Sequence, residues 1–123
     1  EALEILSTLA PFPSGGIVHS FTGSLEIARK YQELGFLISI GGAITQEGYF
    51  ALKKAIPLLP LTQIVVETDS PDQTPRLEGI SLEHNNEPRF LVGIAKAIAE
   101  LKGVEAEEVL SKSTRNLERL FGI

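Results

Sequence analysis

One histidine and two carboxylates stand at positions where α/β proteins carry their chemistry. His19 follows the short apolar run 16–18, and Glu67 and Asp69 close the run that begins at Ile64. Short apolar runs rich in β-branched residues indicate strands buried on both faces, as in parallel sheets. Ligands and catalytic groups gather at the carboxyl ends of such strands. Imidazole and carboxylates bind divalent metals, so the sequence predicts part of a metal site.

Each of these residues also has a purely structural interpretation. A histidine such as His19 can be hydrogen-bonded at a strand end, and Asp69 can form a turn ahead of Pro71. Glu67 is expected on the same strand face as Asp69, where an unpaired carboxylate is costly to bury and therefore needs a partner. His84 lies in a polar loop and is expected to be exposed.

The composition limits which metals the site could bind and which partners and cell location are expected. The chain has 123 residues, no cysteine and a net charge of −5, and we expect one domain over residues 1–123. Because the chain has no thiolate ligand, a site for zinc, manganese or magnesium is favoured over an iron–sulfur cluster or a copper site. The negative charge disfavours non-specific nucleic-acid binding, but a metal can still meet a phosphate locally. We expect no membrane partner, because no apolar run approaches the length of a membrane span and no signal peptide is visible, and we expect a cytoplasmic location.

Strands and helices are predicted to alternate along the chain. Strands are expected at 17–21, 36–40 and 64–68, and helices at 3–9, 24–34, 46–56, 88–102 and 106–120. This order gives right-handed βαβ units and a parallel sheet. Three strands that are apolar on both faces need more cover than an open sheet provides, whereas a closed barrel supplies it over about 250 residues. The predicted fold is α/β, with parallel strands alternating with helices in about half of a TIM-type (β/α) barrel.

Five segments match one known pattern in order and spacing across nearly the whole chain. They are His19-Ser20-Phe21-Thr22-Gly23-Ser24, residues 35–42, Glu67-Thr68-Asp69-Ser70-Pro71, Asn86-Glu87-Pro88, and Asn116 with Arg119-Leu120-Phe121. Together they resemble the C-terminal half of the TatD family of metal-dependent deoxyribonucleases. That family has a (β/α) barrel of the metal-dependent hydrolase superfamily, which agrees with the half-barrel predicted from the strands.

The resemblance implies a function and a set of site residues. His19 would bind one of two divalent metal ions (Mg, Mn or Zn) and Asp69 the other, while Glu67 would act beside Asp69 in catalysis. The residues implied on the substrate side are Ser20, Thr22, Gly23, Ser70 and Asn86. A site of this kind hydrolyses phosphodiester bonds in DNA, since divalent metals activate water and stabilise charge on phosphate oxygens.

The chain also departs from the family pattern. The family's N-terminal half carries a His-x-His pair, a bridging glutamate and a further histidine, none of which has a counterpart here, and the loop 72–85 differs. The chain lacks methionine even at position 1, which favours a start within a longer protein. We therefore expect a missing N-terminal half-barrel or self-association to complete the site. Two alternatives stay open: an inactive, self-associating half-barrel, and a barrel hydrolase acting on C–N or ester bonds.

Overall fold

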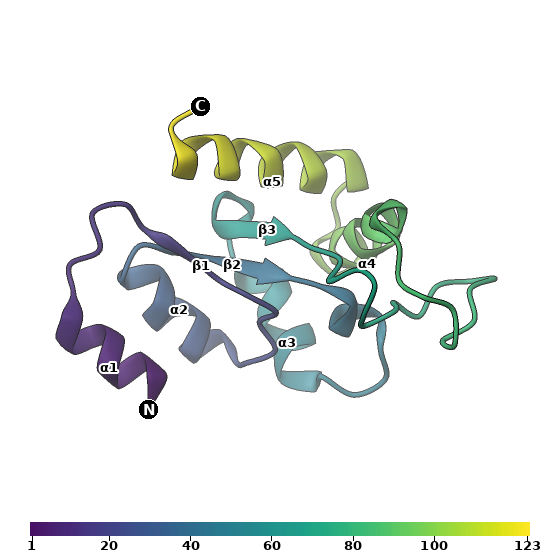
Figure 1. The fold of residues 1–123 in the computed structure, drawn as a ribbon, viewed down its shortest axis with the longest axis horizontal. Helices are drawn as coiled ribbons and strands as arrows, with labels where there is room; N and C mark the ends of the chain where they lie inside the picture. The colour runs from purple at the N-terminus through teal and green to yellow at the C-terminus, as the bar shows by residue number, and fades with distance from the viewer.

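Three parallel strands form the centre of the computed structural model, which describes residues 1–123. They are β1 (Gly16–Val18), β2 (Phe36–Ile40) and β3 (Ile64–Val66), in the order β1-β2-β3 (Figure 1). The register places Ile38 opposite both Val18 and Ile64. All three carboxyl ends therefore lie at the same edge of the sheet. The predicted α/β class, with parallel strands alternating with helices, is confirmed.

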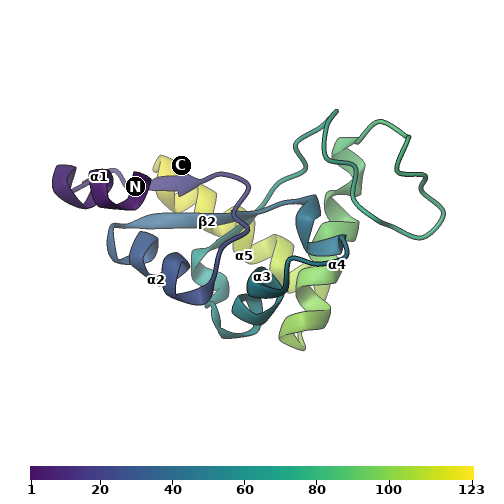
Figure 2. The ribbon, with the colours of Figure 1, turned by 90° about the horizontal axis from the view of Figure 1, so that it is seen from below.

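Five helices and four short turns of 3₁₀ helix surround the strands. The helices are α1 (Ala2–Leu9), α2 (Leu25–Glu33), α3 (Phe50–Ala55), α4 (Leu91–Lys102) and α5 (Ala106–Phe121); the 3₁₀ turns are η1 (Gly42–Thr45), η2 (Ile56–Leu58), η3 (Leu61–Gln63) and η4 (Pro88–Phe90). Figure 1 shows α2 and α3 below the strands and α5 above β3. The long loop between β3 and η4 projects beyond the carboxyl ends of the strands (Figure 2). No helix combines the length and the apolar character that a membrane crossing requires.

The core lies between the strands and their helices. Its most buried side chains come from β2 and β3 and from α2 to α5, namely Ala28, Ile38, Ile40, Leu52, Ile64, Ile94, Ile98 and Val109. Each fully buried aliphatic side chain stabilises the fold by about 1.5–3 kcal/mol relative to exposure. This packing holds the strands in position, and so determines where the residues that follow their carboxyl ends are placed.

The sequence signals at helix ends act largely as expected. The hydroxyl of Ser24 accepts a hydrogen bond from the Ile27 amide and begins α2. Gly103 ends α4 and Gly122 ends α5, both in the left-handed conformation that glycine adopts without strain. These signals explain why the predicted limits of α2, the end of α4 and the limits of α5 are correct to within one residue.

Other limits differ from the prediction for a backbone reason. The strands expected to reach residues 21 and 68 end at Val18 and Val66, and Ser20 (φ 49°) and Asp69 (φ 64°) then turn into the left-handed region. The helix expected from residue 46 begins at Phe50. Residues 48 and 49 are both left-handed, with φ of 81° and 48°, and two such residues in succession exclude a right-handed helix that runs through them from residue 46.

Asn116 ties α5 to the backbone of the sheet. Its side chain is 1% exposed, and its Nδ2 donates to the carbonyls of Leu61 (2.8 Å) and Ile64 (2.7 Å). Asn116 belongs to the last of the five segments matched from the sequence, and the structure shows that it packs against the sheet backbone. A second α5 residue, Ser113, accepts a hydrogen bond from the Val66 amide through its Oγ.

We expect Asn116→Ala to destabilise the chain by about 2 kcal/mol, because the variant leaves buried carbonyl groups without donors. Urea denaturation followed by circular dichroism measures the change. Thr114→Ala is the control, since the Thr114 hydroxyl makes one exposed bond within the same helix. Equal stability of the two variants would contradict this account of Asn116.

Candidate metal centre

Three side chains meet at the carboxyl edge of the sheet. One ligand atom from each of His19, Glu67 and Asp69 lies within 4.8 Å of the other two. His19 Nδ1 is 2.8 Å from Glu67 Oε2, and His19 Nε2 is 3.1 Å from Asp69 Oδ1. Each nitrogen of the imidazole ring therefore faces a carboxylate. The structure brings together the histidine and both carboxylates that the sequence singled out.

The backbone reaches this arrangement by a different route from the predicted one. Strand alternation was expected to place Glu67 and Asp69 on one face, but β3 already ends at Val66. Glu67 still continues the pairing, since its amide donates to the Ile40 carbonyl at 3.1 Å. Asp69 then adopts a left-handed conformation, which is uncommon outside glycine, asparagine and aspartate. The turn at Asp69 redirects its carboxylate toward His19.

Glu67 has the partners that a half-buried carboxylate requires. Its Oε1 accepts a hydrogen bond from the Ser20 amide at 2.7 Å, and its Oε2 accepts from His19 Nδ1 and from the hydroxyl of Ser39. Three donors therefore hold this carboxylate in one orientation. Gly41 allows the close fit, because a Cβ there would stand 3.3 Å from Glu67 Cγ.

Ser39 is a site residue that sequence reasoning missed. It is 2% exposed and lies in the middle of β2, between apolar neighbours. A buried hydroxyl needs a hydrogen-bond partner, and here the partner is Glu67, 28 residues further along the chain. The available signal was a single polar residue inside the apolar run 36–40.

The two carboxylates raise the pKa of His19. The largest cause is the hydrogen bond with Glu67, followed by the charge of Glu67, with smaller contributions in the same direction from Asp69 and an opposing effect of burial. The imidazole consequently holds its second proton more firmly than a free histidine does. A cation bound between the ring and Asp69 would have to displace that proton, so metal binding and protonation compete here.

We expect NMR titration to place the pKa of His19 above 6.5, and Glu67→Gln to lower it because the variant removes the largest cause of the shift. The raised pKa of His19 in the folded state also determines how the stability of the chain depends on pH. The stabilising contribution is fully present below the unfolded-state pKa of about 6.5 and is lost as the pH rises through the folded-state value. Glu118→Gln, an exposed change on α5, is the charge-matched control. A His19 pKa that is the same in both variants would contradict this assignment.

The donor set fits a divalent metal ion. Glu67 is engaged by three donors, and Asp69 Oδ2 accepts from the side-chain amide of Gln73. His19 Nε2 and Asp69 Oδ1 are the atoms left to face an ion. At 3.1 Å apart, both can contact the same ion, since nitrogen and oxygen ligands lie about 2.0–2.2 Å from zinc. This differs from the expectation drawn from the resemblance, in which His19 and Asp69 bind different ions of a pair. A carboxylate behind the other ring nitrogen is the usual support of a metal-binding histidine.

The residues predicted on the substrate side occupy different settings. Ser20 contributes its backbone amide to Glu67, and Thr22 is exposed in the loop that follows β1. Gly23 lies beside Phe21, whose ring stands 2.9 Å from where a Cβ on Gly23 would be. The hydroxyl of Ser70 donates to Thr68 Oγ1 at 3.1 Å.

Asn86 is 3% exposed and fixes the loop that carries Asp69. Its Nδ2 donates to the carbonyls of Thr68, Asp72 (2.6 Å) and Gln73 (3.4 Å), and its Oδ1 has no partner. Only that carbonyl oxygen is left for another donor. His84 is exposed, as predicted from its polar loop, and pairs with Glu87 at 2.7 Å.

Comparison with known proteins identifies the family. Residues 1–122 match the sequence model of the TatD related DNase family. The chain belongs to the TatD family. It is 39% identical over 110 residues to the uncharacterized metal-dependent hydrolase YabD of Bacillus subtilis, covering 89% of this chain and 42% of YabD. It is 36% identical to YcfH of Escherichia coli K12, another uncharacterized metal-dependent hydrolase, covering 100% of this chain and 45% of YcfH.

A TatD relative with a named activity and two solved structures extend the comparison. The 3'-5' ssDNA/RNA exonuclease TatD of Citrobacter rodentium is 33% identical, over 89% of this chain and 42% of its own length. The crystal structure of the TatD homologue YjjV from Escherichia coli K12 matches with a TM-score of 0.86 and 30% identity, covering 98% of this chain and 45% of YjjV. A TatD family hydrolase from Entamoeba histolytica, at 21% identity and a TM-score of 0.69, shares the fold. The chain thus spans less than half the length of these relatives.

Proposed function

We propose that this chain supplies His19 and Asp69 to the divalent-metal site of a TatD-type hydrolase that cleaves phosphodiester bonds in DNA. The observation that carries the proposal is the imidazole of His19, held through Nδ1 by Glu67 while its Nε2 faces Asp69. The exonuclease activity in the name of the Citrobacter rodentium relative supports DNA as the substrate class. The metal-dependent hydrolase names of YabD and YcfH support the metal, with magnesium, manganese or zinc as candidates.

The chain's own residues would perform distinct tasks in this reaction. A divalent ion, when bound, lowers the pKa of water and stabilises charge on phosphate oxygens. Glu67 keeps a proton on His19 Nδ1 and so leaves Nε2 free to act as a ligand. Asp69 brings a negative charge that balances the cation. The loop after β1, with Thr22 and Gly23, lies at the same carboxyl edge and is our candidate for contacts with the substrate phosphate.

We propose further that the site is completed by an N-terminal half-barrel or by a second copy. Two ligands are fewer than the three protein ligands of a typical catalytic zinc site. β1 pairs only with β2 and therefore offers a free edge, and its Ile17 is exposed. Static light scattering separates the two partners: a concentration-dependent dimer supports self-association, and a monodisperse monomer rules it out.

The test of the proposed function compares the chain alone with a completed barrel, in which the N-terminal part of YabD precedes it. We expect the completed barrel to cleave end-labelled single-stranded DNA with Mg²⁺, Mn²⁺ or Zn²⁺ and to stop when the metal is chelated. The chain alone is expected to bind metal weakly by calorimetry and to leave DNA intact. Cleavage of amide or ester substrates in place of DNA would favour the alternative hydrolase. Tight stoichiometric metal binding by the chain alone would contradict the partial site.

A further inference from the structure

A short loop beside the metal centre carries an exposed aromatic residue in an unusual conformation. Tyr49 lies between η1 and α3, and its side chain is 44% exposed. Its backbone is left-handed (φ 48°, ψ 38°), directly after the left-handed Gly48. Bulky residues rarely adopt this conformation, and such outliers persist only where the surrounding structure holds them. The contacts around the loop therefore decide whether the ring has a fixed position.

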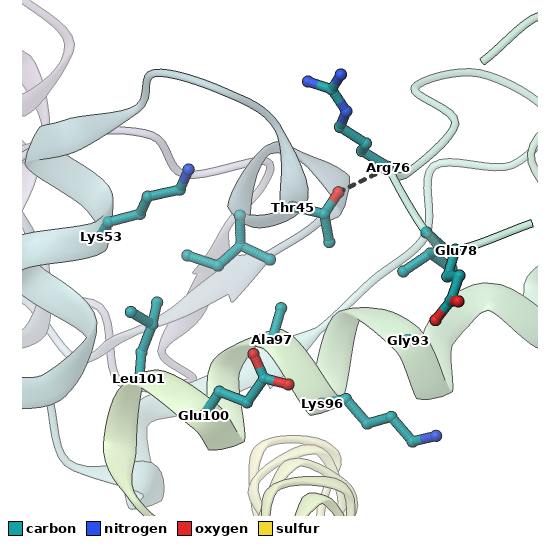
Figure 3. Close-up of a pocket in the computed structure, with 11 residues that line it drawn as sticks. Thr45, Lys53, Arg76, Glu78, Gly93, Lys96, Ala97, Glu100 and Leu101 are labelled. Atoms are coloured by element: carbon teal, nitrogen blue, oxygen red, sulfur yellow. Dashed lines mark hydrogen bonds between the residues drawn. The ribbon is translucent and has the colours of Figure 1, made fainter. Parts of the chain in front are cut away.

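Four contacts hold the loop in place. The Lys53 ammonium donates to the Gln46 carbonyl, and the Gln46 side-chain amide donates to the Thr74 carbonyl at 2.9 Å. Arg76 pairs with Glu47 at 2.5 Å through its guanidinium and donates its amide to Thr45 Oγ1 at 2.8 Å. Figure 3 shows Thr45, Lys53 and Arg76 at the wall of a cavity of about 610 Å³ beside α4. These contacts fix the loop before any ligand arrives, which lowers the entropic cost of binding.

A second, smaller cavity is also lined by residues of this loop. It has a volume of about 280 Å³ and is lined by Gly42, Ala43, Gln46, Glu47, Tyr49 and Gln73, and we call it the Tyr49 cavity. Its volume lies just below the range of about 300–1,000 Å³ typical of drug-sized ligands, so it suits one ring system. Gly42 permits the close approach of the two loops, since a Cβ there would lie 2.7 Å from the Gln73 carbonyl oxygen.

Gln73 connects the Tyr49 cavity to the metal centre. It lines the cavity, and its side-chain amide donates to Asp69 Oδ2. One residue thus belongs both to the lining of the cavity and to the surroundings of Asp69. A strand of nucleic acid with a phosphate at the metal centre could therefore place a neighbouring base in the cavity.

We propose that the Tyr49 cavity binds a nucleobase of single-stranded DNA, with the ring of Tyr49 stacked on the base. This inference rests on the proposed DNA hydrolase function. The lining of the Tyr49 cavity contains no lysine or arginine, and its one charged residue, Glu47, pairs with Arg76, so the lining suits a neutral base better than a phosphate. Stacking on an aromatic ring does not depend on charge and accepts every base.

Tyrosine fluorescence offers a direct test on the chain itself. The chain has no tryptophan and only two tyrosines, so Tyr31→Phe leaves Tyr49 as the sole emitter. In that background we expect single-stranded oligothymidine to quench the emission at about 0.15 M salt, where charge repulsion is screened, and an abasic strand of equal length not to quench it. Absence of quenching by oligothymidine, or equal quenching by the abasic strand, overturns the inference.

A set of variants separates stacking from general effects of the loop. Tyr49→Asn removes the ring but tolerates the left-handed backbone, and fluorescence anisotropy of a labelled oligothymidine should show about ten-fold weaker binding. Tyr49→Phe should bind like the original chain. Phe50→Ala is the matched control, because Phe50 is 74% exposed but lies outside the lining of the cavity, and we expect less than a two-fold change. Unchanged binding by Tyr49→Asn, or an equal loss in Phe50→Ala, overturns the inference.

The failure of this inference can be told apart from the failure of the proposed function. If the completed barrel cleaves single-stranded DNA and the Tyr49→Asn version cleaves it with the same KM, only the stacking inference is wrong. If the completed barrel cleaves no DNA under any metal, the proposed function is wrong and the inference falls with it. A raised KM with kcat retained in Tyr49→Asn supports a role in binding the strand.

Discussion

Asp69→Asn in the completed barrel is expected to lower metal-dependent DNA cleavage by more than about 100-fold. Groups that merely support a metal ligand already account for 10–100-fold in affinity or activity, and Asp69 faces the ion directly in the proposed site. Asparagine keeps the size of the side chain, tolerates the left-handed backbone at φ 64° and can still accept from Gln73. The variant therefore removes the charge and the ligand oxygen with little change in the loop.

The matched control for this variant is Asp72→Asn in the same loop. Asp72 is exposed and contributes its backbone amide to the Asp69 carbonyl at 2.9 Å, which the substitution leaves in place. We expect kcat/KM of the control to stay within about three-fold of the original, since surface substitutions rarely disturb a site. Metal content of the purified proteins, measured by mass spectrometry, should fall in Asp69→Asn alone. Full activity with full metal content in Asp69→Asn would remove Asp69 from the set of ligands.

The regular elements could be predicted because local signals set them. β2 was predicted with its exact limits, since glycines 35 and 41 flank an unbroken apolar run. Ser24 and Gly103 marked helix ends through capping, which depends on neighbours within a few residues. The predicted start of α3 was wrong for a related reason. Tyr49 has no local preference for the left-handed conformation, so nothing in its type announced a turn there.

The candidate site was only partly predictable from the sequence. His19 and Asp69 stand directly after apolar runs that predict strands, and that placement can be read from the sequence alone. The contacts that orient them join residues far apart in the chain: Ser39 meets Glu67 across 28 positions, and Asn86 holds the Asp69 loop across 18 positions through the Thr68 carbonyl. Such pairs depend on strand order and loop packing, which no local pattern encodes.

The hydrogen bonds that position 67 must accept explain why a carboxylate suits it and an amide does not. An acceptor at Nδ1 keeps the ring proton there and leaves Nε2 as the ligand nitrogen. A glutamine at position 67 has only one acceptor atom, whereas Glu67 accepts from the Ser20 amide, the Ser39 hydroxyl and the His19 ring. If the oxygen of the glutamine side chain faces the Ser20 amide, the NH₂ group of that side chain faces His19 Nδ1 and drives the ring proton to Nε2. If the amide flips, two N–H donors oppose each other at Ser20.

Glu67→Gln should therefore lower metal affinity and DNA cleavage in the completed barrel by about 10–100-fold, while the fold is retained. Ser39→Ala should have a smaller effect, because it leaves the Glu67 charge and its bond to Nδ1 intact. Long-range ¹H–¹⁵N NMR of the imidazole, recorded above the raised pKa of His19, should show the proton on Nδ1 in the original chain and in Ser39→Ala, and on Nε2 in Glu67→Gln. The double variant should be no worse than Glu67→Gln, since Ser39 acts through that carboxylate. A Glu67→Gln variant with the proton still on Nδ1 and unchanged activity would show that Glu67 does not set the state of the ring.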